Sequence, residues 1–141
     1  MRILGLDVGD RRIGVALSDP MRILAKPLAV ITVKSGVDPL AEILSLAREH
    51  EVSQIIVGLP RSMDGSIGEQ AVKTKDFADK LSEQTSIPIE FSDERLSTAE
   101  ADRILKSKKK SPQEIKKERD AYAAALILQW YLDEHAPKES F

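Results

Sequence analysis

Short apolar runs separated by polar turns fill the first quarter of the chain, and this pattern is typical of β-strands. Ile3 to Val8 is almost wholly apolar, which predicts a central strand buried on both faces. Gly9 to Arg12 predicts a tight turn, in which Gly9 can adopt a positive φ. Ile13 to Ser18 and Leu28 to Val33 then predict two more strands, with Pro20 to Ala25 as their connection. Three strands joined by short turns are expected to be antiparallel neighbours.

The rest of the chain alternates helical and strand patterns. Asp38-Pro39 is a helix start, because Asp caps a helix and Pro suits the first helical position. The residues behind it recur at helical spacing. Further along, the pattern predicts strands at Gln54–Val57 and Pro88–Phe91, and helices at Glu69–Glu83, after the capping box Ser97–Glu100, and over about Asp120–Leu132. The last helix is apolar nearly all round, which predicts that it is buried.

This order of elements predicts an α/β fold. Strands separated by helices are parallel crossovers, whereas the first three strands are antiparallel. We therefore expect one mixed five-stranded sheet with helices on both faces, formed by a single domain over residues 1–141.

Composition narrows the possible chemistry. The fractions of hydrophobic residues, 42%, and charged residues, 31%, are ordinary for a globular protein with one core. The absence of cysteine excludes disulfides and thiol chemistry, and two histidines do not favour a histidine-rich metal site. Because the N-terminus lacks the apolar run of a signal peptide and no stretch is long enough to span a membrane, we expect a cytoplasmic protein.

Charge is unevenly distributed along the chain. The net charge of −2 argues against a protein that coats nucleic acid without specificity. However, seven basic residues lie between Lys106 and Arg119, opposed only by Glu114 and Glu118. This segment is either a patch that meets a phosphate backbone or a solvated linker, and both interpretations stay open.

Asp7 is the first candidate for chemistry. A carboxylate at the end of an apolar central strand is costly to bury unless something compensates its charge. A divalent cation is one such compensation, since Mg²⁺ takes oxygen ligands and usually one or two protein carboxylates. The alternative is that Asp7 caps its own turn at Gly9. The Asp7-Val8-Gly9 sequence also fits a loop that binds phosphate through backbone amides.

Two further acidic positions join Asp7. Asp93-Glu94-Arg95 directly follows a predicted strand, where ligands of open α/β sheets bind. Asp120 lies where the last predicted helix begins, where it could also be only a partner of the helix dipole. Asp7, Glu94 and Asp120 together would be enough for two divalent ions that clamp the attacking and leaving oxygens of a phosphodiester.

The segment from Gly58 to Gly65 follows the fourth predicted strand. Asp64-Gly65 predicts a turn, and Arg61 could contact nucleic acid. An ordinary ordered loop is the competing interpretation.

Four segments together resemble the YqgF/RuvX family, described as Holliday junction resolvases and as nucleases of the 16S ribosomal RNA precursor. The resemblance covers essentially the whole chain. Its segments are Leu6–Asp19, Gly58–Gly65, Asp93–Thr98 and Asp120–Leu128. It implies a ribonuclease H-like fold and metal-dependent hydrolysis of phosphodiesters through Asp7, Glu94 and Asp120. For such a nuclease we expect two Mg²⁺ or Mn²⁺ ions, with Arg12, Arg61 and Arg95 binding the substrate.

The chain departs from the better-understood resolvases at one ligand position. Their second acidic residue follows the fourth strand, whereas here that strand ends in Gly58-Leu59-Pro60. The role then passes to Glu94, to Asp93 or to Asp64.

Three functions compete at this stage. The first is a nuclease that processes the 5′ end of the 16S ribosomal RNA precursor, or a resolvase of branched DNA. The second is an ATP-binding half-module of the actin and sugar-kinase type, although those proteins duplicate the module. The third is a nucleic-acid-binding module without catalysis. A junction resolvase would need a symmetric dimer and an RNA-trimming enzyme would not, so we expect a monomer or weak homodimer.

Overall fold

One mixed five-stranded sheet organises the molecule. The computed structural model describes residues 1–34, 36–60, 68–94 and 112–135, and for residues 60, 93, 94 and 112–118 it describes the backbone alone. The strand order is β3-β2-β1-β4-β5. The pairs β1–β2 and β2–β3 are antiparallel, and β1–β4 and β4–β5 are parallel. The strands are β1 (Arg2–Val8), β2 (Arg12–Ser18), β3 (Ala25–Thr32), β4 (Val52–Pro60) and β5 (Ile89–Glu94).

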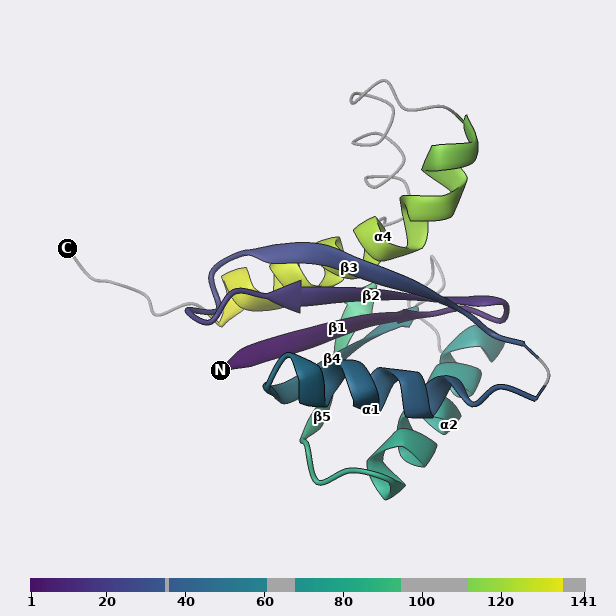
Figure 1. Cartoon of the computed structure of the whole chain (residues 1–141), viewed down its shortest axis with the longest axis horizontal. Helices are drawn as coiled ribbons and strands as arrows, with labels where there is room; N and C mark the ends of the chain where they lie inside the picture. The colour runs from purple at the N-terminus through teal and green to yellow at the C-terminus, as the bar shows by residue number, and fades with distance from the viewer. Residues whose placement is uncertain (35, 61–67, 95–111, 136–141) are drawn as a thin grey trace.

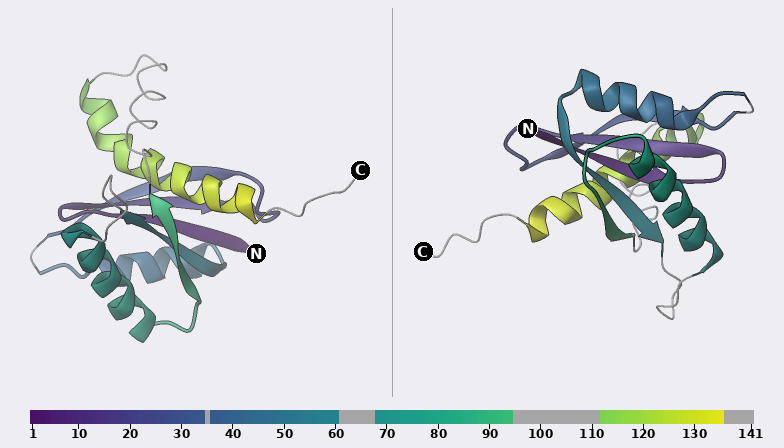
Figure 2. Two further views of the ribbon diagram at one scale, coloured as in Figure 1. Left: turned by 180° about the vertical axis from the view of Figure 1, so that it is seen from behind. Right: turned by 90° about the horizontal axis from the view of Figure 1, so that it is seen from below.

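Helices cover both faces of the sheet, as the sequence predicts. Helices α1 (Pro39–Glu49) and α2 (Glu69–Glu83) lie on one side and α4 (Pro112–Glu134) on the other (Figures 1 and 2). Each face has its own core. Leu4 and Leu6 of β1 belong to the core under α1 and α2, whereas Ile3 packs with Leu128 of α4. Alternate residues of β1 therefore point to opposite faces.

The predicted bounds of four elements were wrong. Strand β3 begins at Ala25, inside the predicted connection, and β4 extends on both sides of Gln54–Val57. Strand β5 continues through residue 94, so Asp93 and Glu94 lie within the strand and do not follow it. Helix α4 begins at Pro112, which places Asp120 in the helix interior and not at its start.

Two other expectations need correction. Trp130 is 59% exposed, so α4 is not buried all round. Gly9 does not have a positive φ; instead, a side chain there would come within 2.8 Å of the Arg12 carbonyl oxygen. The start of α1 was predicted correctly, since Asp38 accepts a hydrogen bond from the Leu40 amide at 3.0 Å. The helix predicted after Ser97 lies outside the described residues.

Strand β3 is an edge of the sheet and is irregular. Val15 pairs with Ala29 but the next residue, Ala16, pairs with Pro27, so Leu28 forms a β-bulge. Pro27 also lacks a backbone N–H. Both features interrupt the regular hydrogen-bonding pattern of this edge.

The loop between β2 and β3 is held by a single carboxylate. Asp19 accepts hydrogen bonds from the amides of Ile23 at 2.7 Å, Leu24 at 2.9 Å and Met21 at 3.2 Å. These bonds, that of Leu24 first, lower the pKa of Asp19 because they stabilise the charged form. Gln129 of α4 fastens the same loop: its side chain donates to the Ile23 carbonyl and accepts from the Ala25 amide, both at 2.9 Å.

Tyr131 anchors the C-terminal half of α4 to the parallel strands. Its hydroxyl donates to Glu90 Oε2 of β5 at 2.9 Å and accepts from Gln54 Nε2 of β4 at 3.0 Å. Burial, and then the hydrogen bond to Glu90, raise the pKa of Tyr131. None of the helices in the described parts of the chain combines the length and the hydropathy that a membrane crossing requires.

Candidate active site

Asp7 lies near the end of β1 on the face that α4 covers. Strand alternation places it with Ile3 and Gly5, and Gly5 lies directly under α4: a Cβ on it would be 2.8 Å from Leu128 Cβ. On β2, the residue opposite Asp7 is Gly14. Directly opposed residues of an antiparallel pair share a face, so Gly14, which has no side chain, lies beside Asp7 on the α4 face.

Asp120 comes to the same place from α4. Its carbonyl oxygen lies 1.8 Å from the ideal position of a Cβ on Gly14, so the helix backbone rests directly on this glycine. The Asp120 side chain is 20% exposed and accepts a hydrogen bond from Arg12 Nε to its Oδ2 at 2.7 Å. Gly14 thus brings together two of the three predicted acidic residues, Asp7 across the sheet and Asp120 above it.

The third acidic position lies on β5. Residue 94 is partnered with Pro60 of β4, two residues beyond the pair Gly58–Ser92. Strand alternation groups position 94 with Ser92 and with Glu90, which bonds to Tyr131 of α4, and position 93 with the opposite face. The backbone therefore favours position 94 over 93 for a site on the α4 face. The side chains of Asp93 and Glu94 are outside the described part of the structure.

The start of α2 and the β1–β2 turn border this end of the sheet. Gln70 donates to the Val8 carbonyl at 3.3 Å, and Lys73 Nζ lies 3.6 Å from Asp10 Oδ1. Arg11 is exposed in the turn. The predicted residues Arg61, Asp64 and Arg95 lie outside the described residues. So do the side chains of the predicted basic patch, except that of Arg119, which is half-buried.

The donor chemistry here fits a hard divalent cation. Asp7 and Asp120 supply carboxylate oxygens, and Mg²⁺ usually binds through one or two carboxylates together with substrate phosphate. Across the described side chains, no group of three such donors converges. Asp7 and Asp120, with position 94, are the residues that would hold the ion.

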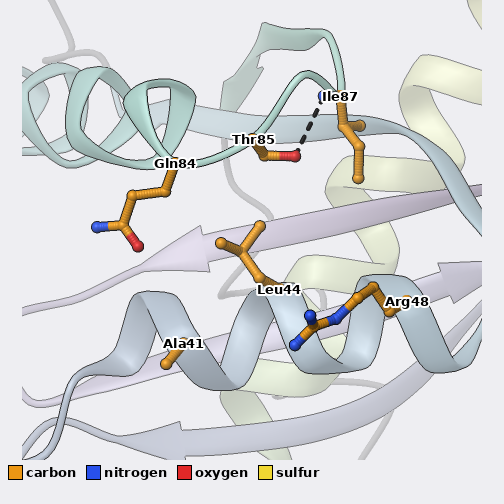
Figure 3. Close-up of a pocket in the computed structure, with 6 residues that line it drawn as sticks. All are labelled: Ala41, Leu44, Arg48, Gln84, Thr85 and Ile87. Carbon is orange, nitrogen blue, oxygen red and sulfur yellow. Dashed lines mark hydrogen bonds between the residues drawn. The ribbon is translucent and has the colours of Figure 1, made fainter.

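A separate hollow of about 300 Å³ lies away from these carboxylates (Figure 3). It opens between α1, along Ala41, Leu44 and Arg48, and the segment from Gln84 to Ile87 that follows α2. The parallel strands begin at this end of the sheet, whereas Asp7 lies where β1 ends. The hollow contains none of the predicted site residues.

Comparison with known proteins decides the family. The RuvX family, described as Holliday junction resolvase, matches residues 1–134. This chain belongs to the RuvX family. Two relatives, both named "Putative pre-16S rRNA nuclease", are as long as this RuvX member. That of Roseiflexus sp. is 46% identical over 132 residues, covering 94% of each chain. That of Halothermothrix orenii is 47% identical over 133 residues, covering 94% of this chain and 95% of the relative.

Solved structures confirm the ribonuclease H-like fold that the RuvX resemblance implies. Thermus thermophilus RuvC in complex with a Holliday junction substrate aligns with a TM-score of 0.55 at 15% identity, over 98% of this chain and 99% of the other. A fowlpox virus resolvase bound to Holliday junction DNA aligns with a TM-score of 0.58 at 11% identity, over 97% and 100%. The family and relatives place this RuvX member among hydrolases of phosphodiester bonds.

Sequence reasoning missed the positions that make room for the site in this RuvX member. Gly5 and Gly14 were predicted only as members of apolar strands. Both glycines allow α4 to approach the sheet closely. The predicted hairpin could have indicated this role, because it places Gly5 and Gly14 on the same face of the sheet. Ser92, buried on β5 beside Gly58, also went unnoticed.

Proposed function

We propose that this chain is a metal-dependent nuclease that hydrolyses structured nucleic acid, with the 5′ end of the 16S ribosomal RNA precursor as its substrate. The observation that carries the proposal is that Gly14 lies opposite Asp7 on β2 and directly under the Asp120 backbone of α4. The names of relatives at 46–47% identity support the RNA substrate. A substrate made within the cell also fits a cytoplasmic site of action.

The residues of the site divide the work. Asp7 and Asp120, with Glu94, would hold one or two Mg²⁺ or Mn²⁺ ions. Such ions supply the charge that activates a water and stabilises the leaving oxygen. Asp7, on a rigid central strand, and Asp120, held by the packing of α4 on Gly14, would be preorganised for this task. No side chain needs to act as a nucleophile.

The proposal is tested by a cleavage assay with the purified protein, Mn²⁺ and a 16S precursor transcript, beside Asp7→Asn. We expect specific cleavage that Asp7→Asn abolishes while its circular dichroism and thermal unfolding match those of the parent. Asp79→Asn, an exposed aspartate of α2, is the matched control and should cleave normally. Cleavage by Asp7→Asn at the parent rate would refute the proposed role of this carboxylate.

A synthetic four-way junction is the second substrate in that assay, because the family is described as Holliday junction resolvase. Resolution needs two active sites and therefore a symmetric dimer. The substrate would be branched DNA, and not RNA, if the junction is cleaved faster than the transcript and this cleavage depends on Asp7. The protein should then also sediment as a dimer. Binding of either nucleic acid without cleavage in any metal would leave a binding module instead.

A further inference from the structure

The ion pair between Arg12 and Asp120 places a positive charge inside the candidate metal site. Arg12 Nε is 2.7 Å from Asp120 Oδ2, and the two side chains are 34% and 20% exposed. Arg12 lies two residues before Gly14 on β2, and Asp120 rests on Gly14. The close contact between Asp120 and Gly14 therefore holds both members of the pair near one another.

The Arg12–Asp120 ion pair offsets repulsion between neighbouring carboxylates. Asp7 lies across from Gly14, so the site holds two carboxylates on one half-buried face. Neighbouring carboxylates disfavour each other's charged form unless a cation offsets them. Arginine is permanently protonated, and Arg12 supplies that cation without any metal.

The same positive charge acts against an incoming divalent ion. The ion would meet one Asp120 oxygen already bound and a guanidinium close by. We propose that Arg12 is the resident counter-ion of this site: it neutralises Asp120 in the metal-free protein, and a divalent ion competes with it for that carboxylate. This inference rests on the metal site of the proposed function. It adds a role to the expectation that Arg12 binds substrate, since Arg12 contacts Asp120 through its Nε donor.

Calorimetric titration with Mn²⁺, without nucleic acid, tests the proposal. A unit charge about 6 Å from a divalent ion in a water-like dielectric changes the dissociation constant about tenfold. We therefore expect Arg12→Gln to bind Mn²⁺ about tenfold more tightly than the parent. Arg12→Lys keeps the charge and should stay within about twofold of the parent affinity. Arg11→Gln, the exposed neighbouring arginine, is the matched control and should also stay within that range.

Two other results of the Mn²⁺ titration would each point to a different role of Arg12. Weaker Mn²⁺ binding by Arg12→Gln would mean that Arg12 serves the metal only by orienting Asp120. Unchanged affinity with a lower melting temperature would mean that the ion pair merely fastens α4 to β2. Either result overturns the proposal.

A second measurement on the parent protein needs no variant to fold. Titration with diamagnetic Mg²⁺ should shift the ¹⁵Nε resonance of Arg12 as the ion saturates the site, whereas that of Arg11 should not move. A static Arg12 signal at saturation would refute the competition. Absence of cleavage by a protein that binds Mn²⁺ and shows these shifts would refute the proposed nuclease and leave the role of Arg12 intact.

Discussion

The carbonyl oxygen of Asp120 occupies the space that a Cβ on Gly14 would need, 1.8 Å from its ideal position. Gly14→Ala therefore forces a main-chain atom of α4 away from the sheet, and no side-chain rotation relieves the clash. We expect a loss of about 3 kcal/mol in the free energy of unfolding, the upper end for overpacking. Cleavage should fall as well, because Asp120 moves with the helix. Urea unfolding and the cleavage assay measure the two effects.

Two other glycines provide graded controls. A Cβ on Gly5 would meet Leu128 Cβ at 2.8 Å, a side-chain contact of the same helix, so Gly5→Ala should cost less than Gly14→Ala. A Cβ on Gly68 meets nothing within 4 Å, so Gly68→Ala should cost only the modest penalty of alanine at the N-cap of α2. An equal loss for all three substitutions would contradict the close packing of α4.

The two acidic residues of β5 should differ in their effect on cleavage. Strand alternation groups position 94 with the α4 face and position 93 with the opposite face. Glu94→Gln should lower kcat about 100-fold or more, a typical cost of removing one group that stabilises the transition state. Asp93→Asn should leave kcat near the parent value. A larger effect of Asp93→Asn would transfer the ligand role to that residue.

Protonation of Asp19 at low pH should destabilise the β2–β3 loop. Its pKa is lowered in the folded protein, so its contribution is fully present above the unfolded pKa near 3.8 and is lost as pH falls through the folded value. Asp19→Asn removes the charge and should melt at a lower temperature at pH 7. The difference in melting temperature between the two proteins should shrink below pH 3.8; a constant difference would argue against the carboxylate's role.

Tyr131 should matter for stability and not for cleavage. Tyr131→Phe removes the hydroxyl that joins Gln54 to Glu90, at a cost of about 1 kcal/mol. The raised pKa of Tyr131 means that folding favours the neutral phenol. The stabilisation that this phenol provides is therefore present below its pKa in the unfolded chain, about 10, and is lost as pH rises through its pKa in the folded protein. Denaturant unfolding between pH 7 and pH 11 tests both points. A drop in kcat for this variant would mean that α4 transmits changes between its two ends.

Much of the fold was readable from the sequence because local signals agreed with the tertiary structure. Apolar alternation and the Asp38-Pro39 cap gave the order of the elements and the mixed sheet. The errors have physical causes. The first turns of α4 project beyond the sheet (Figure 1), so its apolar pattern begins only near Asp120, whereas the helix begins at Pro112.

The site was less readable than the fold. Charged residues suggested that β5 ends before Asp93, whereas the pairing of Pro60 with Glu94 carries the strand onward. Pairing of this kind is a property of the neighbouring strand and leaves no local signal. The bond between Arg12 and Asp120 joins residues 108 positions apart, and the sequence assigned each of them a separate role.

The irregular edge at β3 bears on how two copies of the chain could assemble. A strand from a second molecule would have to align with a bulge at Leu28 and with Pro27, which donates no hydrogen bond. Continuous extension of the sheet across this edge is therefore disfavoured. If this enzyme cuts both strands of a four-way junction, its two copies should meet through a surface other than strand pairing at β3, and that surface will set the spacing between the two cuts.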